Sequence, residues 1–134
     1  MGVPVIAIVD DDASVRSALE RLTRALGYEA RLFEGGRAFL DALAGNGIAM
    51  VITDVQMPHL NGLELLRLLS EHKPDLPVLV MTAYPSEAME GRALALGALA
   101  CLAKPFGADQ LEGWLHQLFS DGHNQNAGFT QGRT

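Results

Sequence analysis

Five candidate strands, four of them short apolar runs, are separated by segments with helical periodicity, and this alternation most limits how the chain can fold. The apolar runs cover residues 5–9, 50–53, 78–81 and 100–103, and residues 31–33 (Arg-Leu-Phe) are a plausible second strand. The apolar runs are continuous and rich in Val and Ile, which is typical of strands buried on both faces of a parallel sheet. The chain therefore predicts a sheet whose strands are covered from both sides.

Each candidate strand is followed by apolar residues at a spacing of three or four, which predicts a helix with one buried stripe. Glycines are expected to end two of these helices, at Gly27 and Gly97, and Gly62 is expected to begin the third for steric reasons. The stripes contain Val15, Ala18, Leu19, Leu22, Ala25 and Leu26; Phe39, Leu40 and Leu43; Leu63, Leu66 and Leu69; residues 88–96; and Leu111, Trp114, Leu115 and Leu118.

Regular alternation of strand and helix predicts an α/β fold with right-handed crossovers and helices on both faces of one parallel sheet. Ligands of such doubly wound sheets bind outside the carboxyl ends of the strands. Residues 121–134 are polar, Gly-rich and aperiodic. We therefore expect one domain over residues 1–120, followed by a flexible tail or the start of an interdomain linker.

Composition narrows the class of protein. The 134 residues suffice for one domain with a substantial core, and 49% hydrophobic against 19% charged residues excludes a disordered chain. The net charge of −6 argues against nonspecific binding to nucleic acid. No apolar stretch approaches the roughly 20 residues that span a membrane, and the N-terminus lacks a signal-peptide pattern. Cys101 is the single cysteine, so no internal disulfide forms and we expect a cytoplasmic setting.

Polar residues follow four of the five candidate strands. Asp10 and Asp11 follow the first, Asp54 the third, Thr82 the fourth and Lys104 the fifth. Carboxylates brought together at one sheet edge raise each other's pKa values, and a hard divalent cation such as Mg²⁺ resolves the repulsion. A lysine at the same edge can pair with a phosphate. These residues predict a site for a metal ion and a phosphoryl group.

Each of these residues also has a plainer explanation. Residues 10–12 could simply cap the following helix, a role that we assign mainly to Asp12. Asp54 could be a turn residue, Thr82 could cap the next segment, and Lys104 could be a solvated lysine before a turn. Their joint occurrence at matching strand ends favours the site.

The combination resembles the receiver domain of bacterial two-component response regulators, and the resemblance implies a flavodoxin-like (βα)5 fold with strand order 2-1-3-4-5. It covers roughly residues 5–119 and rests on IVDDD (8–12), ITDVQMPHLNG (52–62), VMTA (80–83) and AKPF (103–106). The segments VDDDASVR (9–16) and TDVQMP (53–58) look most like the FixJ-like, LuxR-type regulators.

The resemblance implies a role for each acidic residue. Asp54 would be the phosphoacceptor and one of the metal ligands. Asp11 would bind Mg²⁺ (or Mn²⁺) directly, and Asp10 would contribute through a water molecule. Gln56 would offer its backbone carbonyl to the metal.

The resemblance also implies a switch. Thr82 would move to the phosphoryl group, Lys104 would pair with it, and the peptide bond before Pro105 would be cis. Most receivers carry Tyr or Phe three residues before the lysine, where this chain has Cys101. Tyr84, two residues after Thr82, would either screen Asp54 from water or take over part of the missing aromatic's work.

The implied function is a phosphorylatable signalling switch, not an enzyme with a diffusible product. A sensor histidine kinase or a phosphotransfer protein would donate the phosphoryl group to Asp54 in a Mg²⁺-dependent reaction. The readout surface would be residues 86–96 and 100–119, which could also form a homodimer. FixJ-like regulators carry a DNA-binding effector domain, whereas this domain is not expected to bind nucleic acid or membrane itself.

Two other functions compete. A pseudo-receiver would bind partners without using phosphate; Cys101 is the feature that favours it, and the retained Asp54, Thr82 and Lys104 argue against it. A flavodoxin-like cofactor binder or small phosphatase would use the same sheet. The acidic loop after the first run lacks the Gly- or Ser/Thr-rich phosphate cradle that such proteins need.

Overall fold

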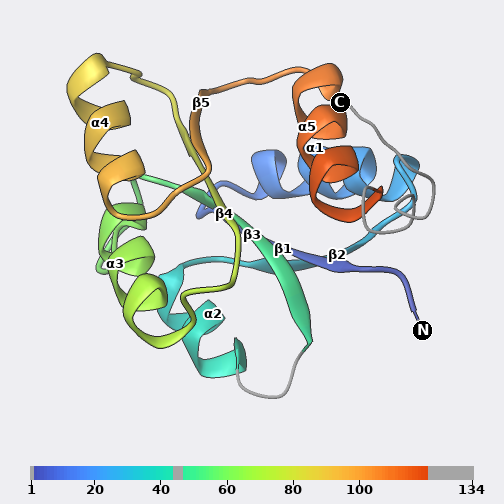
Figure 1. Cartoon of the computed structure of the whole chain (residues 1–134), viewed down its shortest axis with the longest axis horizontal. Helices are drawn as coiled ribbons and strands as arrows, with labels where there is room; N and C mark the ends of the chain where they lie inside the picture. Colours follow the sequence, from blue (N-terminus) through green and yellow to red (C-terminus); the bar gives the residue numbers. More distant parts are fainter. Residues whose placement is uncertain (1, 44–46, 121–134) are drawn as a thin grey trace.

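The computed structural model describes residues 2–43 and 47–120, which fold into one parallel sheet with helices on both faces (Figure 1). The strand order is β2-β1-β3-β4-β5, and each neighbouring pair is parallel. The strands are β1 Val5–Val9, β2 Glu29–Phe33, β3 Ile48–Asp54, β4 Val78–Thr82 and β5 Ala100–Ala103. The predicted fold class and strand order are confirmed.

The helices lie where the apolar stripes predicted them. They are α1 Ala13–Ala25, α2 Gly36–Leu43, α3 Gly62–His72, α4 Glu87–Ala95 and α5 Ala108–Leu115. The α-helix α5 ends before the predicted Leu118, which lies in a π-helical turn, His116–Ser120. Leu118 and Phe119 still pack against the core, and the Phe119 ring lies 5.6 Å from that of Tyr28.

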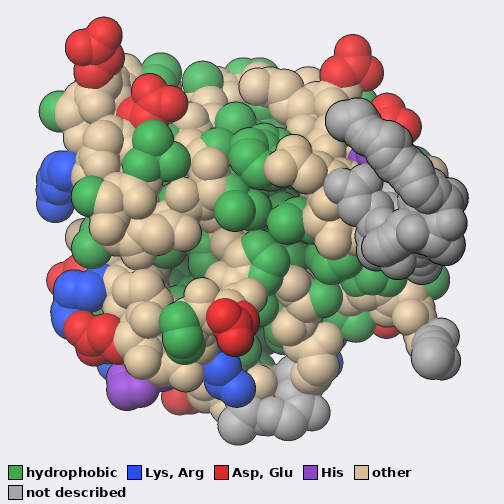
Figure 2. Space-filling view, viewed as in Figure 1, with side chains coloured by type: hydrophobic (Ala, Val, Ile, Leu, Met, Phe, Trp, Pro, Cys, Tyr) green, Lys and Arg blue, Asp and Glu red, His purple; other side chains and the backbone are tan. Residues whose placement is uncertain are grey.

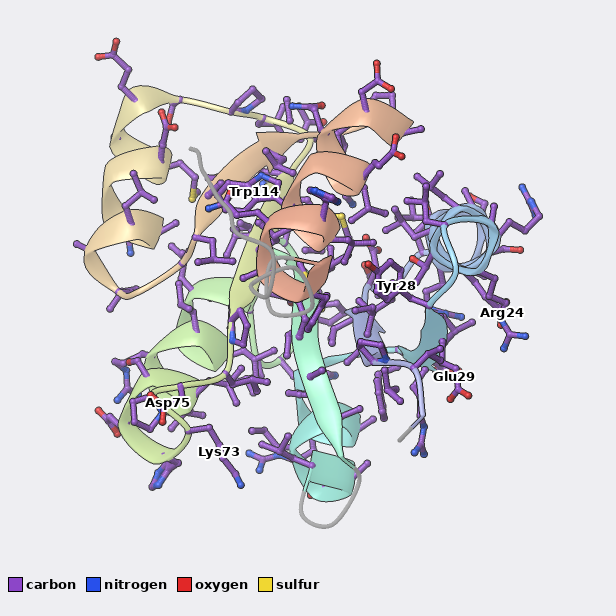
Figure 3. The ribbon with its side chains drawn as sticks, turned by 45° about the vertical axis from the view of Figure 1, so that its right-hand side comes forward. Arg24, Tyr28, Glu29, Lys73, Asp75 and Trp114 are labelled. Carbon is purple, nitrogen blue, oxygen red and sulfur yellow. The ribbon has the colours of Figure 1, made fainter. Side chains whose placement is uncertain are left out.

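The two faces of the sheet carry two separate hydrophobic cores. Alternate strand residues such as Ile8 and Ile52 pack under α1 and α5, whereas Val9 and Val51 pack under α2, α3 and α4. Trp114, on α5, belongs to the first of these packing layers (Figure 3). Because both faces are covered, the carboxyl edge of the sheet is where buried strands open to ligands.

Helix ends follow local chemistry. The carboxylate of Asp12 caps α1 by accepting a hydrogen bond from the Ser14 amide at 2.9 Å, as the sequence predicted. Gly27 and Gly97 follow α1 and α4 with φ angles of 99° and 105°, a left-handed conformation that glycine adopts without strain. No helix in the described ranges is both long and apolar enough to cross a membrane.

The loop between β3 and α3 folds tightly beneath Asp54. The Gly62 amide donates to the Val55 carbonyl at 2.8 Å, and the Asn61 and Glu64 side chains form a reciprocal capping box at the start of α3. A Cβ atom at Gly62 would overlap the Asp54 carbonyl oxygen and lie 2.8 Å from the Val55 Cα. The predicted steric role of Gly62 is confirmed.

This packing predicts that Gly62→Ala destabilises the domain by about 1–3 kcal/mol, because rigid backbone atoms must move to admit the methyl group. Urea unfolding measures the effect. The matched control is Gly91→Ala in α4, where an added Cβ meets no atom within 4 Å. That control is expected to stabilise by about 0.5–1 kcal/mol. Equal midpoints for the two variants would contradict the steric role of Gly62.

Candidate functional site

The polar residues singled out from the sequence meet at the carboxyl edge of the sheet. Asp10 follows β1, Asp54 ends β3, Thr82 ends β4 and Lys104 follows β5. The register pairs Asp54 of β3 with Met81 of β4, so Thr82 lies one residue further than Asp54 toward the carboxyl edge of the sheet. The Lys104 amide donates to the Thr82 carbonyl at 2.8 Å, which fixes the lysine to the end of β4.

Three carboxylates form a cluster at this edge. Asp10, Asp11 and Asp54 each offer an oxygen, and these oxygens all lie within 4.8 Å of one another. Asp10 is fully buried and Asp54 is 4% exposed, whereas Asp11 is exposed. The cluster therefore has two buried members and one that faces solvent.

Lys104 bridges the two buried carboxylates. Its ammonium nitrogen lies 2.8 Å from Oδ2 of Asp10 and 3.2 Å from Oδ1 of Asp54. The lysine side chain is only 18% exposed, so water screens these ion pairs weakly. The peptide bond between Lys104 and Pro105 is cis, as the resemblance to receiver domains implied.

Burial and the contacts between Lys104 and the carboxylates act on the pKa values of this cluster in opposite directions. Burial, followed by the charge of Asp10, raises the pKa of the Asp54 carboxyl, and the Lys104 ammonium offsets only part of that rise. For Lys104, burial disfavours the ammonium, but its contacts with Asp10 and Asp54 outweigh burial and raise the pKa. Asp54 is thus a carboxylate whose negative charge is incompletely compensated.

The donor set fits a hard divalent cation. Oδ2 of Asp10 and Oδ1 of Asp54 are buried and accept no hydrogen bond within the described residues, although the Lys104 ammonium forms an ion pair with each. Three carboxylates against one ammonium leave an excess of negative charge. Mg²⁺ prefers oxygen ligands of this kind and needs only one or two carboxylates. The cluster can therefore bind a metal ion.

The loop that carries Asp10 and Asp11 is held by its backbone and by a residue that the sequence analysis missed. The Asp10 amide donates to the Phe33 carbonyl at 3.1 Å, and the Asp12 amide donates to Oδ1 of Asp10 at 2.9 Å. The guanidinium of Arg16 donates to the Asp10 carbonyl at 2.7 Å. Arg16 lies in the quoted motif, but spacing alone could not show which atom it contacts.

The residues expected to act as a switch lie in different environments. Thr82 is fully buried, and its hydroxyl oxygen accepts a hydrogen bond from the Tyr84 amide at 3.0 Å. The Tyr84 side chain is 73% exposed. Cys101 is half-buried against the core beneath α4, where burial and then the charge of Glu90 raise the pKa of its thiol. The thiol is thus less reactive than a free one.

Comparison with known proteins places this geometry in a family. The model of the response regulator receiver domain matches residues 6–116. The transcriptional regulatory protein FixJ of Bradyrhizobium diazoefficiens is 40% identical over 106 residues, which are 79% of this chain and 52% of that protein. The chain belongs to the response regulator receiver domain family. It spans about half the length of FixJ.

Solved structures of receivers share the fold. Vibrio cholerae chemotaxis protein CheY4 is 26% identical with a TM-score of 0.80, covering 88% of this chain and all of that one. A Burkholderia pseudomallei response regulator, solved with a phosphorylated aspartic acid, a calcium ion and citrate, is 25% identical with a TM-score of 0.76. The match covers 92% of this receiver and 71% of that chain.

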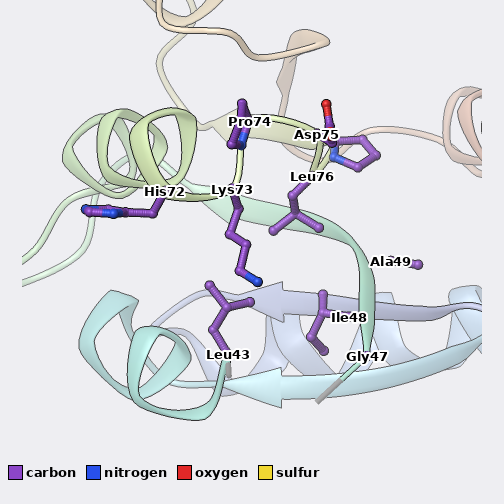
Figure 4. Close-up of a pocket in the computed structure, with 10 residues that line it drawn as sticks. Leu43, Gly47, Ile48, Ala49, His72, Lys73, Pro74, Asp75 and Leu76 are labelled. Atoms are coloured by element: carbon purple, nitrogen blue, oxygen red, sulfur yellow. The ribbon is translucent and has the colours of Figure 1, made fainter. Parts of the chain in front are cut away.

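Of two pockets on the receiver, one lies beside the acidic cluster and the other lies at the opposite edge of the sheet. An apolar groove of about 470 Å³ runs from α1 to the loop after β5 and includes Lys104, so it opens beside the site. A second pocket of about 510 Å³ lies at the opposite, amino edge of β3 and β4, where the Lys73 side chain extends toward Leu43 (Figure 4). This second pocket contains none of the predicted site residues.

The raised pKa of Asp54 predicts that Asp54→Asn stabilises the receiver at neutral pH. The folded state holds the Asp54 proton more tightly than the unfolded chain does. The contribution of Asp54 to the free energy of unfolding therefore falls as pH rises from the ordinary pKa of 3.8 through the raised folded value. The side-chain amide of the Asp54→Asn variant is neutral at every pH, so it carries no charge that has to be buried. Lys104 still has Asp10 as an ion-pair partner in this variant. Thermal unfolding is expected to show a midpoint a few degrees higher at pH 7, with the gain shrinking toward about pH 4.

The control for that measurement is Asp41→Asn, which removes an exposed carboxylate from α2. It is expected to leave the midpoint close to that of the parent at both pH values. A gain for Asp54→Asn that did not change with pH, or a loss at pH 7, would contradict the uncompensated charge of Asp54.

Proposed function

We propose that this receiver takes a phosphoryl group onto Asp54 from a sensor histidine kinase or a phosphotransfer protein, in a Mg²⁺-dependent reaction. The observation that carries the proposal is the placement of Asp54. Its carboxylate lies at the end of β3, 3.2 Å from the Lys104 ammonium and within the three-carboxylate cluster. A buried nucleophile beside a fixed cation is the arrangement that phosphoryl transfer needs.

The chemistry follows from these positions. An Asp54 carboxylate oxygen attacks phosphorus, the new P–O bond forms as the P–N bond to the donor imidazole breaks, and the imidazole leaves with the bonding electrons. The Lys104 ammonium stabilises the negative charge spread over the phosphoryl oxygens. The chain thus supplies positioning and electrostatics rather than acid–base chemistry. Hydrolysis of the acyl phosphate returns the Asp54 carboxylate and resets the switch.

The metal would be held by Asp11, Asp54 and the backbone carbonyl of Gln56. Both oxygens of Asp10 are already engaged, one by the Asp12 amide and one by Lys104, so Asp10 would act through a water molecule. Bound Mg²⁺ (or Mn²⁺) adds positive charge next to the phosphoryl oxygens. The Burkholderia relative, with a phosphorylated aspartic acid and a calcium ion, supports this assignment.

The donor would reach Asp54 beside the apolar groove that includes Lys104. The groove is lined by α1 residues such as Val15 and Leu19 and by Pro105 and Phe106. An amphipathic helix of a donor protein can cover such a surface with its apolar face. Docking there would place a phosphohistidine at the carboxyl edge of the sheet.

Phosphorylation would be read out on α4, β5 and α5. The hydroxyl of Thr82 accepts one hydrogen bond and keeps its proton free to donate to a phosphoryl oxygen. Hydrophobic side chains gather on the face between α4 and α5 (Figure 2), which suits a homodimer or another partner. Light scattering before and after phosphorylation tests the dimer.

We propose that the receiver comprises residues 1–120. Residues 121–134, which lie outside the described residues, would be a flexible tail or the start of an interdomain linker. FixJ is about twice as long as the matched region. A DNA-binding effector domain would account for that additional length in a regulator of this kind.

Intact mass after incubation with Mg²⁺ and acetyl phosphate tests the proposed function. The parent is expected to gain one phosphoryl group, and neither Asp54→Asn nor the parent with EDTA is expected to gain any. No gain by the parent, with Mg²⁺ binding verified, would favour the pseudo-receiver, for which Cys101 is the supporting feature. A gain by Asp54→Asn equal to that of the parent would contradict the assignment of Asp54.

A further inference from the structure

Asp11 is the one carboxylate of the cluster that no side chain holds. It is exposed, and its carboxylate makes no hydrogen bond or ion pair to the described residues. Asp10 and Asp54, by contrast, are buried and paired with Lys104. Among the described residues, only the backbone of Asp11 therefore fixes where its side chain starts, through the direction of its Cα–Cβ bond.

Two hydrogen bonds fix the backbone around Asp11. The Asp12 amide donates to Oδ1 of Asp10 at 2.9 Å, which closes an Asx turn with Asp11 at its centre. The Arg16 guanidinium donates to the Asp10 carbonyl at 2.7 Å. That carbonyl belongs to the planar peptide unit that joins Asp10 to Asp11, and the Cα atom of Asp11 lies in this plane. The hydrogen bond from Arg16 therefore restrains the orientation of the peptide unit that precedes the Asp11 side chain.

The position of Arg16 is hard to explain by helix stability or by ion pairing. It lies near the amino end of α1, where the helix dipole disfavours a cation. Three carboxylates lie close by, yet the guanidinium makes no ion pair with any described residue and is directed at a backbone carbonyl. The side chain is half-buried in that arrangement.

We propose that Arg16 is a positioning residue for the metal site, and that its bond to the Asp10 carbonyl orients the Asp11 carboxylate toward the ion. The inference rests on the proposed function, because it needs Mg²⁺ to bind at this cluster. Arg16 does not touch the ion or the phosphoryl group. It acts through the peptide unit between Asp10 and Asp11.

Charge and positioning predict opposite results when Arg16 is removed. Loss of a nearby positive charge would, by itself, make Mg²⁺ bind more tightly. Loss of the bond to the Asp10 carbonyl would free the peptide and make Mg²⁺ bind more weakly. Residues that orient metal ligands commonly contribute about tenfold or more to metal affinity, so positioning is expected to win.

The test is calorimetric titration of Mg²⁺ into the unphosphorylated receiver, with amide chemical shifts of Asp11 and Gln56 as a second readout. Arg16→Met is expected to weaken Mg²⁺ binding about tenfold. The matched control is Arg24→Met, which removes the same charge from α1 at a residue that pairs with Glu20 on the outer surface (Figure 3). That control is expected to bind Mg²⁺ as the parent does.

The outcomes separate this inference from the function on which it rests. A parent that binds Mg²⁺, with Arg16→Met binding equally or more tightly, would overturn the positioning role alone. A parent that binds no Mg²⁺ would overturn the proposed function and the positioning role together. If Arg16→Met does not fold, Arg16→Lys decides: it keeps the charge but not the planar fork, so weaker binding supports the role and unchanged binding overturns it.

Discussion

The contact of one ammonium with two buried carboxylates is the interaction on which the rest of the site depends. Lys104 lies within 2.8 Å of Asp10 and 3.2 Å of Asp54, and it reaches both because β5 ends at the same edge as β1 and β3. Loss of the ammonium would cost about 3–5 kcal/mol, since two buried carboxylates would be left without compensation. The two carboxylates and the lysine thus form a unit that is held together by the ammonium.

That unit carries more negative than positive charge, which ties stability to function. Burial of Asp54 is unfavourable for the ionised carboxylate, and the Asp10 charge adds to the cost. The same features make the site attractive to a cation and place a nucleophile beside a fixed ammonium. Stability is given up at the point where we propose that the receiver binds a metal ion and a phosphoryl group.

Much of this could be predicted from the sequence, because the main signals are local. Short apolar runs followed by helical stripes determined the fold class, and a polar residue directly after a run marked the carboxyl edge. The cap at Asp12 and the steric role of Gly62 also follow from local chemistry. Strand order, by contrast, came from the family resemblance and not from the residues themselves.

Other features depend on contacts that spacing does not encode. The bond from Arg16 to the Asp10 carbonyl requires the loop conformation, and the capping box at Asn61 was overlooked although its sequence pattern is present. The π-helical turn after α5 carries Phe119, whose ring lies 5.6 Å from that of Tyr28, a contact between segments far apart in the sequence. The exposure of Tyr84 likewise follows from the tertiary structure and not from its position two residues after Thr82.

Locating the phosphoryl group tests the central claim most directly. The receiver, phosphorylated with acetyl phosphate and Mg²⁺, would be treated with borohydride, which reduces an aspartyl phosphate to homoserine, and then digested for peptide mapping. The account predicts homoserine at position 54 and aspartate unchanged at positions 10 and 11. Homoserine at either of those positions, or a stable phosphate on Thr82 instead, would contradict the account.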